Sequence, residues 1–312
     1  MKSLRLVGLA LCLVLVSTAA VRADETKITV AALSPPDIVE LYYAIDHDLF
    51  RKAGLDVTVQ PMNNGAASMA ALVGGSAQIG YGNVLSLALA HRRGIPVQLI
   101  APGGGYDTKA VDAAVLVASD APFKTPRDLE GRTIAVVSLH DLTAVSIEGW
   151  LEKAGADATK VHFAEMPPSS MLAALEAKRV DAMGVYEPFL SNAEMHGAKI
   201  FGKSYDSIAP AFMVTGWFAL TPWADQHKAA VARFADVLSH VSPYVNTHYD
   251  ELIPLISRIT KIPPEALHHM AHPYIYPSLA TAPIQPVIDA AAKFHEIPEA
   301  FPARELIFPG IP

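Results

Sequence analysis

The stretch Ile28-Thr29-Val30-Ala31-Ala32-Leu33, followed by Ser34-Pro35-Pro36-Asp37, decides how this chain folds. Its first six residues are apolar or β-branched, which indicates a buried strand. The two prolines end that strand, and Asp37 can cap a helix predicted from Ile38 to His47. A buried strand that leads directly into a helix is typical of an α/β fold.

The same alternation of strand and helix continues along the chain in two successive series. In the first series, further strands are predicted at residues 55–59, 78–81 and 97–101. In the second series, strands are predicted at residues 114–117, 133–137, 161–163 and 180–185. This spacing predicts two mostly parallel sheets with helices on both faces. Gly103-Gly104-Gly105, between the two series, is interpreted as a flexible turn.

A return strand and a helical tail complete the predicted architecture. The return strand is predicted at Met213–Leu220, and the tail helices at residues 224–239, 243–259, 264–271 and 283–295. Two α/β series with such a tail predict a two-lobed clamshell. We expect residues 24–115 and 215–312 to form lobe one and residues 116–214 to form lobe two. Two strands that cross between the lobes would act as a hinge.

The first 23 residues have the pattern of a secretory signal peptide. Lys2 and Arg5 precede an apolar run from Leu6 to Val16, and small residues lead up to Ala23. The run is shorter than the roughly 20 residues that a membrane-spanning helix requires. We therefore expect export and cleavage after Ala23, with an uncleaved anchor as the alternative.

Charge and cysteine content exclude several classes of protein. Without residues 1–23 the chain has 21 Lys and Arg against 31 Asp and Glu, and an acidic chain binds nucleic acid and anionic lipid poorly. Cys12, the single cysteine, lies inside the apolar run. The remainder therefore has no disulfide, no thiol nucleophile and no cysteine-bound zinc. We expect no cofactor.

The candidate binding residues follow from where open α/β sheets bind ligands. Ligands bind beyond the carboxyl ends of the strands, where helix N-termini present N–H groups and a partial positive charge. The loops at these ends contain Ser34, Asp37, Asn64, Gly82 and Asn83 in lobe one, and Leu139, His140, Asp141, Thr143, Ser169, Tyr186 and Glu187 in lobe two. Trp217, on the return strand, is added because it lies close to the expected hinge.

Each candidate also has a purely structural alternative. Asp37, Asn83, Asp141, Thr143 and Ser169 could each cap a helix. Glu187 could form an ion pair within lobe two, and Trp217 could belong to the core.

Four segments resemble, in the same order, a known family of receptors. These are Leu41–Asp46 with Leu49-Phe50 and Ala53–Val57, then Ala71–Gly80, Asp128–Val136, and Val180–Ala182 with Tyr186-Glu187-Pro188. They resemble motifs of periplasmic sulfonate, taurine, nitrate and thiamine-pyrimidine binding proteins, although Gln78 replaces the usual Asp. The resemblance covers about residues 28–220.

This resemblance implies a periplasmic-binding-protein fold of type II, with a hinge of two strands and a helical C-terminal region. It also implies a periplasmic location, a small-molecule solute and an inner-membrane ABC permease as partner. We expect a monomer. Fungal pyrimidine synthases of this fold carry a cysteine cluster, which residues 24–312 lack. The prediction is therefore a receptor and not an enzyme.

The choice of solute depends on the charges of the candidate loops. They contain no Arg or Lys, and Asp141 and Glu187 would repel an anion, although uncharged N–H groups can still hold one. Tyr186 and Trp217 could stack on a flat ring. The sequence therefore favours a pyrimidine-like or other heteroaromatic or amine solute over a small anion such as a sulfonate, taurine, nitrate or an aromatic carboxylate. This preference disappears if Asp141 only caps its helix and Glu187 is paired elsewhere.

Two other classes of function remain as alternatives. An extracytoplasmic hydrolase would need an activated nucleophile, but the chain has no Gly-x-Ser-x-Gly motif. A metal-binding protein is suggested by His268, His269 and His272, but the Glu of a zincin motif is absent, and a solvated helix face explains these residues better. A sensor kinase remains an alternative partner to the importer.

Overall fold

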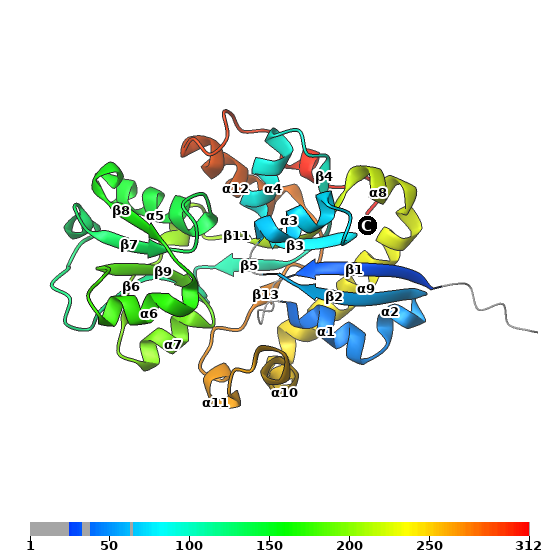
Figure 1. Cartoon of the computed structure of the whole chain (residues 1–312), viewed down its shortest axis with the longest axis horizontal. Coiled ribbons are helices and arrows are strands. Elements are labelled where there is room, and N and C mark those ends of the chain that lie inside the picture. Colours follow the sequence, from blue (N-terminus) through cyan, green and yellow to red (C-terminus); the bar gives the residue numbers. More distant parts are fainter. Residues whose placement is uncertain (1–24, 33–37, 63–64, 312) are drawn as a thin grey trace, which may run out of the picture.

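The computed structural model describes residues 25–32, 38–62 and 65–311. The first of its two large sheets has five strands (Figure 1). The strand order is β2-β1-β3-β12-β4. The strands are β1 (Thr26–Ala32), β2 (Leu55–Pro61), β3 (Ile79–Asn83), β4 (Val97–Pro102) and β12 (Thr215–Leu220). β1 runs parallel to β2 and β3, whereas β12 runs antiparallel to β3 and β4. The return strand thus enters the middle of the sheet.

Helices cover both faces of this first sheet. They are α1 (Val39–Asp46), α2 (Leu49–Lys52), α3 (Gly65–Val73), α4 (Val84–Arg92), α8 (Thr221–Gln226), α9 (Lys228–Thr247), α10 (Tyr249–Thr260), α11 (Pro264–Leu267) and α12 (Thr281–Lys293). Successive side chains of a strand point to opposite faces. Ile28 and Val30 therefore pack with α1 and α9, whereas Ala31 packs with α4 and α12. The second of these clusters also includes Leu142 and Val145 of α5, so the core continues beyond the first sheet.

The second sheet also has five strands, in the order β10-β6-β9-β7-β8. The strands are β6 (Ala113–Val117), β7 (Thr133–Val136), β8 (His162–Glu165), β9 (Ala182–Tyr186) and β10 (Lys199–Gly202). Its helices are α5 (Leu142–Lys153), α6 (Pro168–Glu176) and α7 (Phe189–Met195). Ala114 and Leu116 pack in a cluster with α6 and α7, whereas Val115 and Val117 pack with α5 on the other face. The predicted α/β class is confirmed.

A small third sheet connects the two larger ones. It consists of β5 (Gly104–Asp107) between β11 (Ala211–Met213) and β13 (Tyr274–Ile275). β5 leads from the first sheet to the second, β11 leads back, and β13 comes from the helical tail (Figure 1). Of the expected lobe boundaries, the one after residue 115 falls inside β6 and the one after residue 214 falls between β11 and β12.

The prediction of a flexible turn at Gly103-Gly104-Gly105 is wrong. Gly104 and Gly105 begin strand β5. Gly103 and Gly105 lack a side chain at positions where other segments of the chain approach closely. A Cβ on Gly103 would lie 2.8 Å from the carbonyl oxygen of Thr215, and a Cβ on Gly105 would collide with the ring of Tyr276. The missing side chains therefore serve packing and not turn formation.

The prediction of a helix break before Pro243 is also wrong. Helix α9 runs through Pro243 and ends at Thr247, and helix α10 begins after His248. Phe234, Leu238 and Val241 form a continuous buried face on α9, so packing outweighs the single hydrogen bond that a proline removes. Within residues 25–32, 38–62 and 65–311, no helix is both long and apolar enough to cross a bilayer.

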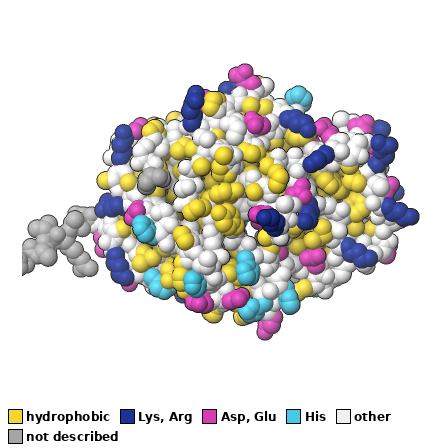
Figure 2. All heavy atoms as spheres, turned by 180° about the vertical axis from the view of Figure 1, so that it is seen from behind, with side chains coloured by type: hydrophobic (Ala, Val, Ile, Leu, Met, Phe, Trp, Pro, Cys, Tyr) yellow, Lys and Arg dark blue, Asp and Glu magenta, His cyan; other side chains and the backbone are white. Residues whose placement is uncertain are grey.

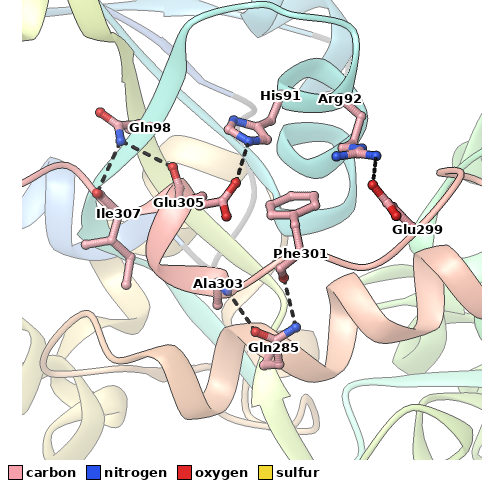
Figure 3. A network of polar contacts seen from close by, with 9 residues as sticks. All are labelled: His91, Arg92, Gln98, Gln285, Glu299, Phe301, Ala303, Glu305 and Ile307. Atoms are coloured by element: carbon pink, nitrogen blue, oxygen red, sulfur yellow. Dashed lines mark hydrogen bonds and ion pairs between the residues drawn. The ribbon is translucent and has the colours of Figure 1, made fainter.

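The chain beyond α12 is fastened to the first sheet (Figure 3). Gln98 on β4 donates to the carbonyl oxygens of Glu305 and Ile307, at 3.2 and 3.3 Å. Gln285 on α12 accepts from the N–H of Ala303 at 2.7 Å. These contacts cover β4, the edge strand of the sheet, and fix α12 beside α4.

We expect Gly103→Ala to lower the free energy of unfolding by about 1–3 kcal/mol, because the added Cβ meets backbone atoms that cannot move aside. Its neighbours would be the carbonyl oxygen and carbon of Thr215, at 2.8 and 2.9 Å. Urea denaturation measures the difference. Gly74→Ala, at an exposed position just after α3, is the control: its Cβ would lie 3.1 Å from the carbonyl oxygen of Ala70, a looser approach, so it should lower stability by clearly less than Gly103→Ala. Equal stability of the two variants would contradict the tight approach of β5 and β12.

Candidate functional site

The carboxyl ends of the two large sheets point toward the same crossing strands. Asn83, the last residue of β3, pairs with Thr215, the first residue of β12, which the chain reaches shortly after β11. Tyr186, the last residue of β9, pairs with Ala113, which the chain reaches shortly after β5. The helices α3 and α4 begin on one side of the crossing, and α5, α6 and α7 on the other (Figure 1). This is where an open α/β sheet binds its ligand.

On the side of the first sheet, two helix N-termini lie together. Gly82 on β3 and Gly65 at the start of α3 approach so closely that a Cβ on Gly82 would lie 3.3 Å from the Cα of Gly65. Asn83 caps α4, because its Oδ1 accepts from the N–H of Ser86 at 2.7 Å. The capping role considered for Asn83 is therefore present. The candidates Ser34, Asp37 and Asn64 lie outside the described residues.

On the side of the second sheet, Asp141 caps α5. Its Oδ1 accepts from the N–H of Ala144 at 2.9 Å. Burial raises the pKa of this carboxyl to about 7. The backbone N–H groups of Ala144 and Thr143 lower the pKa, whereas the negative charges of Glu165 and Glu296 raise it further. A carboxyl with this pKa is partly neutral at pH 7 and repels an anion less than an ordinary aspartate does.

The other candidates near α5 and α6 do not converge on one point. Leu139 is 45% exposed, and Ser169 is exposed in the first turn of α6. Thr143 is buried against Tyr205. His140 is exposed and its Nδ1 lies 3.1 Å from Oε2 of Glu296, which follows α12. His140 therefore links the second sheet to the helical tail.

Glu187, after β9, accepts three hydrogen bonds. Its donors are the N–H of Ser191 at 3.1 Å, the hydroxyl of Ser191 at 2.6 Å and the N–H of Ala271 at 3.3 Å. Burial raises the pKa of the Glu187 carboxyl. The carboxylate thus caps α7 and holds the tail, and it makes hydrogen bonds where an ion pair was considered. Tyr186 beside it is half-buried, with its ring centroid 6.2 Å from that of Phe189.

Trp217 lies in the core and not in the candidate site. Its side chain has no exposed surface, and its indole N–H donates to Oε1 of Glu40 at 3.2 Å. The ring centroid lies 4.5 Å from that of Tyr81 and 5.8 Å from that of Phe234. Trp217 sits on the central strand β12 and faces the layer of α1 and α9, so it cannot stack on a ligand in this structure.

A surface hollow of ≈ 250 Å³ lies away from the carboxyl ends of the strands. It is lined by Ala44, Ile45, Asp48, Phe50, Arg51 and Val57. These residues come from the end of α1, from α2 and from the beginning of β2. The hollow is therefore at the opposite end of the sheet from the candidate site.

The histidines do not form a metal centre in the described part of the chain. No three His, Cys, Asp or Glu side chains come together there in a way that could hold a metal ion. Most histidines visible on the rear face lie along its lower edge (Figure 2). His268 lies 3.8 Å from Asp250, and His272 stacks on Tyr249.

Comparison with known proteins identifies the family. Residues 35–251 match the family described as NMT1/THI5 like. The chain belongs to the NMT1/THI5-like family. It is 24% identical over 227 residues to the taurine-binding periplasmic protein of Escherichia coli (strain K12), which covers 72% of this chain and 69% of that protein. The resemblance found in the sequence motifs is thus confirmed.

Solved structures confirm the periplasmic-binding-protein fold for this member of the NMT1/THI5-like family. The alkanesulfonate-binding protein SsuA from Xanthomonas axonopodis pv. citri, bound to MOPS, superposes with a TM-score of 0.75 at 17% identity, covering 92% of this chain and 99% of that one. The desulfurization enzyme DSZB superposes with a TM-score of 0.68 at 14% identity, covering 91% and 97%. The fold therefore occurs in binding proteins and in an enzyme.

We expect Asp141→Asn to flatten the pH dependence of stability, because asparagine keeps the cap and cannot titrate. The carboxyl has a pKa of about 7 in the folded protein against an ordinary value of 3.8, so the folded state holds more protons between these values. The free energy of unfolding should therefore fall as pH rises from about 4 to 7, and the variant should lack on the order of 2 kcal/mol of that fall. Urea denaturation at several pH values measures it.

Asp157→Asn is the control, because the carboxyl of Asp157 should change the free energy of unfolding with pH in the opposite direction to that of Asp141. Asp157 caps a short 3-10 turn by accepting from the N–H of Thr159 at 3.1 Å, and hydrogen bonds with Thr159 lower the pKa of its carboxyl. The stability that the Asp157 carboxylate contributes is present above about pH 4 and is lost as the pH falls below that value. Parallel pH profiles for wild type and Asp141→Asn would show that Asp141 titrates like an exposed aspartate.

Proposed function

We propose that this protein is a periplasmic solute-binding receptor of an ABC importer, and that its solute is a small organic sulfonate such as taurine. The observation that carries this proposal is the family membership, together with sequence similarity to a taurine-binding periplasmic protein over 72% of the chain. The two sheets with facing carboxyl ends fit this function, because a solute can contact both at once.

The contacts of the two carboxylates favour an anion over the heteroaromatic or amine solute expected from the sequence. That expectation required Asp141 and Glu187 to face the ligand. Asp141 caps α5, and Glu187 caps α7 and holds Ala271. Trp217, one of the two expected stacking partners, is buried, whereas the other, Tyr186, is half-buried. The reasons for preferring an amine are therefore removed, the support for a flat ring is reduced to Tyr186, and the small-anion alternative agrees with the relatives.

Neutral donors would hold the anion. The N-termini of α3 and α4 lie side by side at Gly65 and Gly82, and α5 begins on the facing sheet. The first turn of a helix carries N–H groups and a partial positive charge, which bind sulfate-like groups without any Lys or Arg. Asn83 lies at the N-terminus of α4 and belongs to this proposed site.

The mechanism would be closure of two lobes about the crossing strands. In this proposal residues 24–115 and 215–312 move against residues 116–214, with β5, β11 and β13 near the axis. A solute that contacts both lobes only in the closed form shifts the equilibrium toward it. An inner-membrane permease would recognise the closed monomer. Delivery to the periplasm would depend on the signal peptide proposed at residues 1–23.

Binding is favoured over catalysis by the sequence relatives. The similarity to the enzyme DSZB is a similarity of fold at 14% identity, whereas the taurine-binding relative is matched in sequence over most of the chain. We therefore propose no reaction.

Isothermal titration calorimetry against a solute panel tests the function. We expect taurine and ethanesulfonate to bind with micromolar affinity, corresponding to about −8 kcal/mol, and to raise the thermal midpoint of the protein. Cytosine and putrescine should do neither. Binding of cytosine or putrescine without binding of either sulfonate would overturn the proposed solute and restore the expectation from the sequence.

A negative charge introduced at Asn83 provides a second test. Aspartate and serine both cap helices, so Asn83→Asp and Asn83→Ser should fold equally well. The new carboxylate at the N-terminus of α4 should weaken taurine binding at least about tenfold by repulsion, whereas serine should change it at most a few-fold. Calorimetry at pH 8 gives both affinities. Equal affinities for the two variants would place the anion away from α4.

A further inference from the structure

Tyr249, the first residue of α10, has a buried hydroxyl group without a partner. Its side chain is 3% exposed, and among the described residues no hydrogen-bond partner reaches its hydroxyl oxygen. Other tyrosines in the interior are paired: the hydroxyl of Tyr106 donates to Asp206 at 2.8 Å, and that of Tyr81 lies 2.6 Å from the Thr215 hydroxyl. Buried hydroxyl groups are rarely left unpaired, so this one requires an explanation.

The position of Tyr249 brings it close to the candidate site. Its ring stacks on that of His272, with centroids 4.3 Å apart. In the same short segment, the N–H of Ala271 donates to Glu187 at 3.3 Å, and the carbonyl of His269 accepts from Ser191 at 3.4 Å. Tyr249 therefore lies against the segment through which the helical tail contacts the loop after β9.

The hydroxyl group of Tyr249 is a hydrogen-bond donor at every physiological pH. Burial, and then the negative charges of Glu187 and Asp250, raise its pKa to about 12. Glu187 already accepts three hydrogen bonds, and none of them comes from Tyr249. The phenolic proton thus remains available for another acceptor at this place.

We propose that Tyr249 is a solute-binding residue, whose hydroxyl donates a hydrogen bond to an oxygen of the bound solute. This inference rests on the proposed function, because it places the residue in the same site. A donor without a protein partner suits a solute rich in acceptors, and a sulfonate has three such oxygens. A site built to bind an oxygen discriminates strongly against analogues that lack it, so Tyr249 would contribute to specificity.

The variant Tyr249→Phe tests the inference in two independent measurements. In the ligand-free protein the thermal midpoint should stay the same or rise, because only an unpaired hydroxyl is removed. The dissociation constants of taurine and ethanesulfonate should rise about 5- to 20-fold. Tyr244→Phe is the matched control: Tyr244 lies in the last turn of α9, and its exposed hydroxyl donates to Glu251 at 2.8 Å. It should leave both sulfonate affinities unchanged.

Three results would overturn the inference. A thermal midpoint of ligand-free Tyr249→Phe more than about 3 °C below the wild type would show that the hydroxyl has a protein partner. Unchanged sulfonate affinity would show that it does not touch the solute. If Tyr249→Phe weakens sulfonate binding in the wild type but not in a Glu187→Gln variant, the hydroxyl of Tyr249 acts through Glu187 and not on the solute.

Failure of the proposed function would look different. A wild-type protein that binds no sulfonate would disprove the proposed solute class. The role of Tyr249 would then be tested with the panel compound that does bind, whose dissociation constant should rise by the same factor in Tyr249→Phe. The stability measurement is independent of any solute.

Discussion

The close backbone packing of the crossing strands is the constraint on which the rest of this structure depends. β5 lies between β11 and β13, and the glycines at 103 and 105 leave no room for a side chain against Thr215 and Tyr276. Because the chain leaves and re-enters each large sheet through this narrow crossing, the carboxyl ends of β3 and β9 must both point toward it. The location of the candidate site thus follows from the way the two sheets are joined.

Local patterns in the sequence predict the two large sheets and most of their helices. Ile28 to Leu33 and Thr133 to Val137 show the apolar runs of buried strands, and the structure has β1 at Thr26–Ala32 and β7 at Thr133–Val136. The interpretation of the glycines at 103–105 is wrong because a glycine that permits close approach and a glycine that permits a turn look the same in sequence. The difference depends on residues more than a hundred positions away, which no local pattern contains. The helix break expected before Pro243 is absent because packing of the buried face of α9 outweighs the local effect of the proline.

The sequence predicts which loops follow the ends of the strands, but it does not predict the contacts that their side chains make. Asn83, Asp141 and Glu187 stand where the strands were expected to end, yet each binds the first turn of its own following helix. Trp217 was placed near the hinge by its position in the sequence, but the pleat of β12 turns it into the core toward Glu40. Ala271 and Glu296, which contact this region from the tail, carry no sequence signal because their contacts are long-range.

The use of carboxylates as helix caps bears on the kind of solute that we propose for this site. Asp141 and Glu187 accept hydrogen bonds from N–H groups of α5 and α7. Because these donors already engage the two carboxylates, their charges oppose an anion less than the sequence suggested. The donors that remain to be satisfied at this place include the hydroxyl of Tyr249, which no described residue accepts from. A region where acceptors are engaged and a donor is free favours a solute that brings its own acceptor oxygens. In the proposed function, the helical tail would supply part of the selectivity, and the two sheets would supply the frame that brings the tail to the solute.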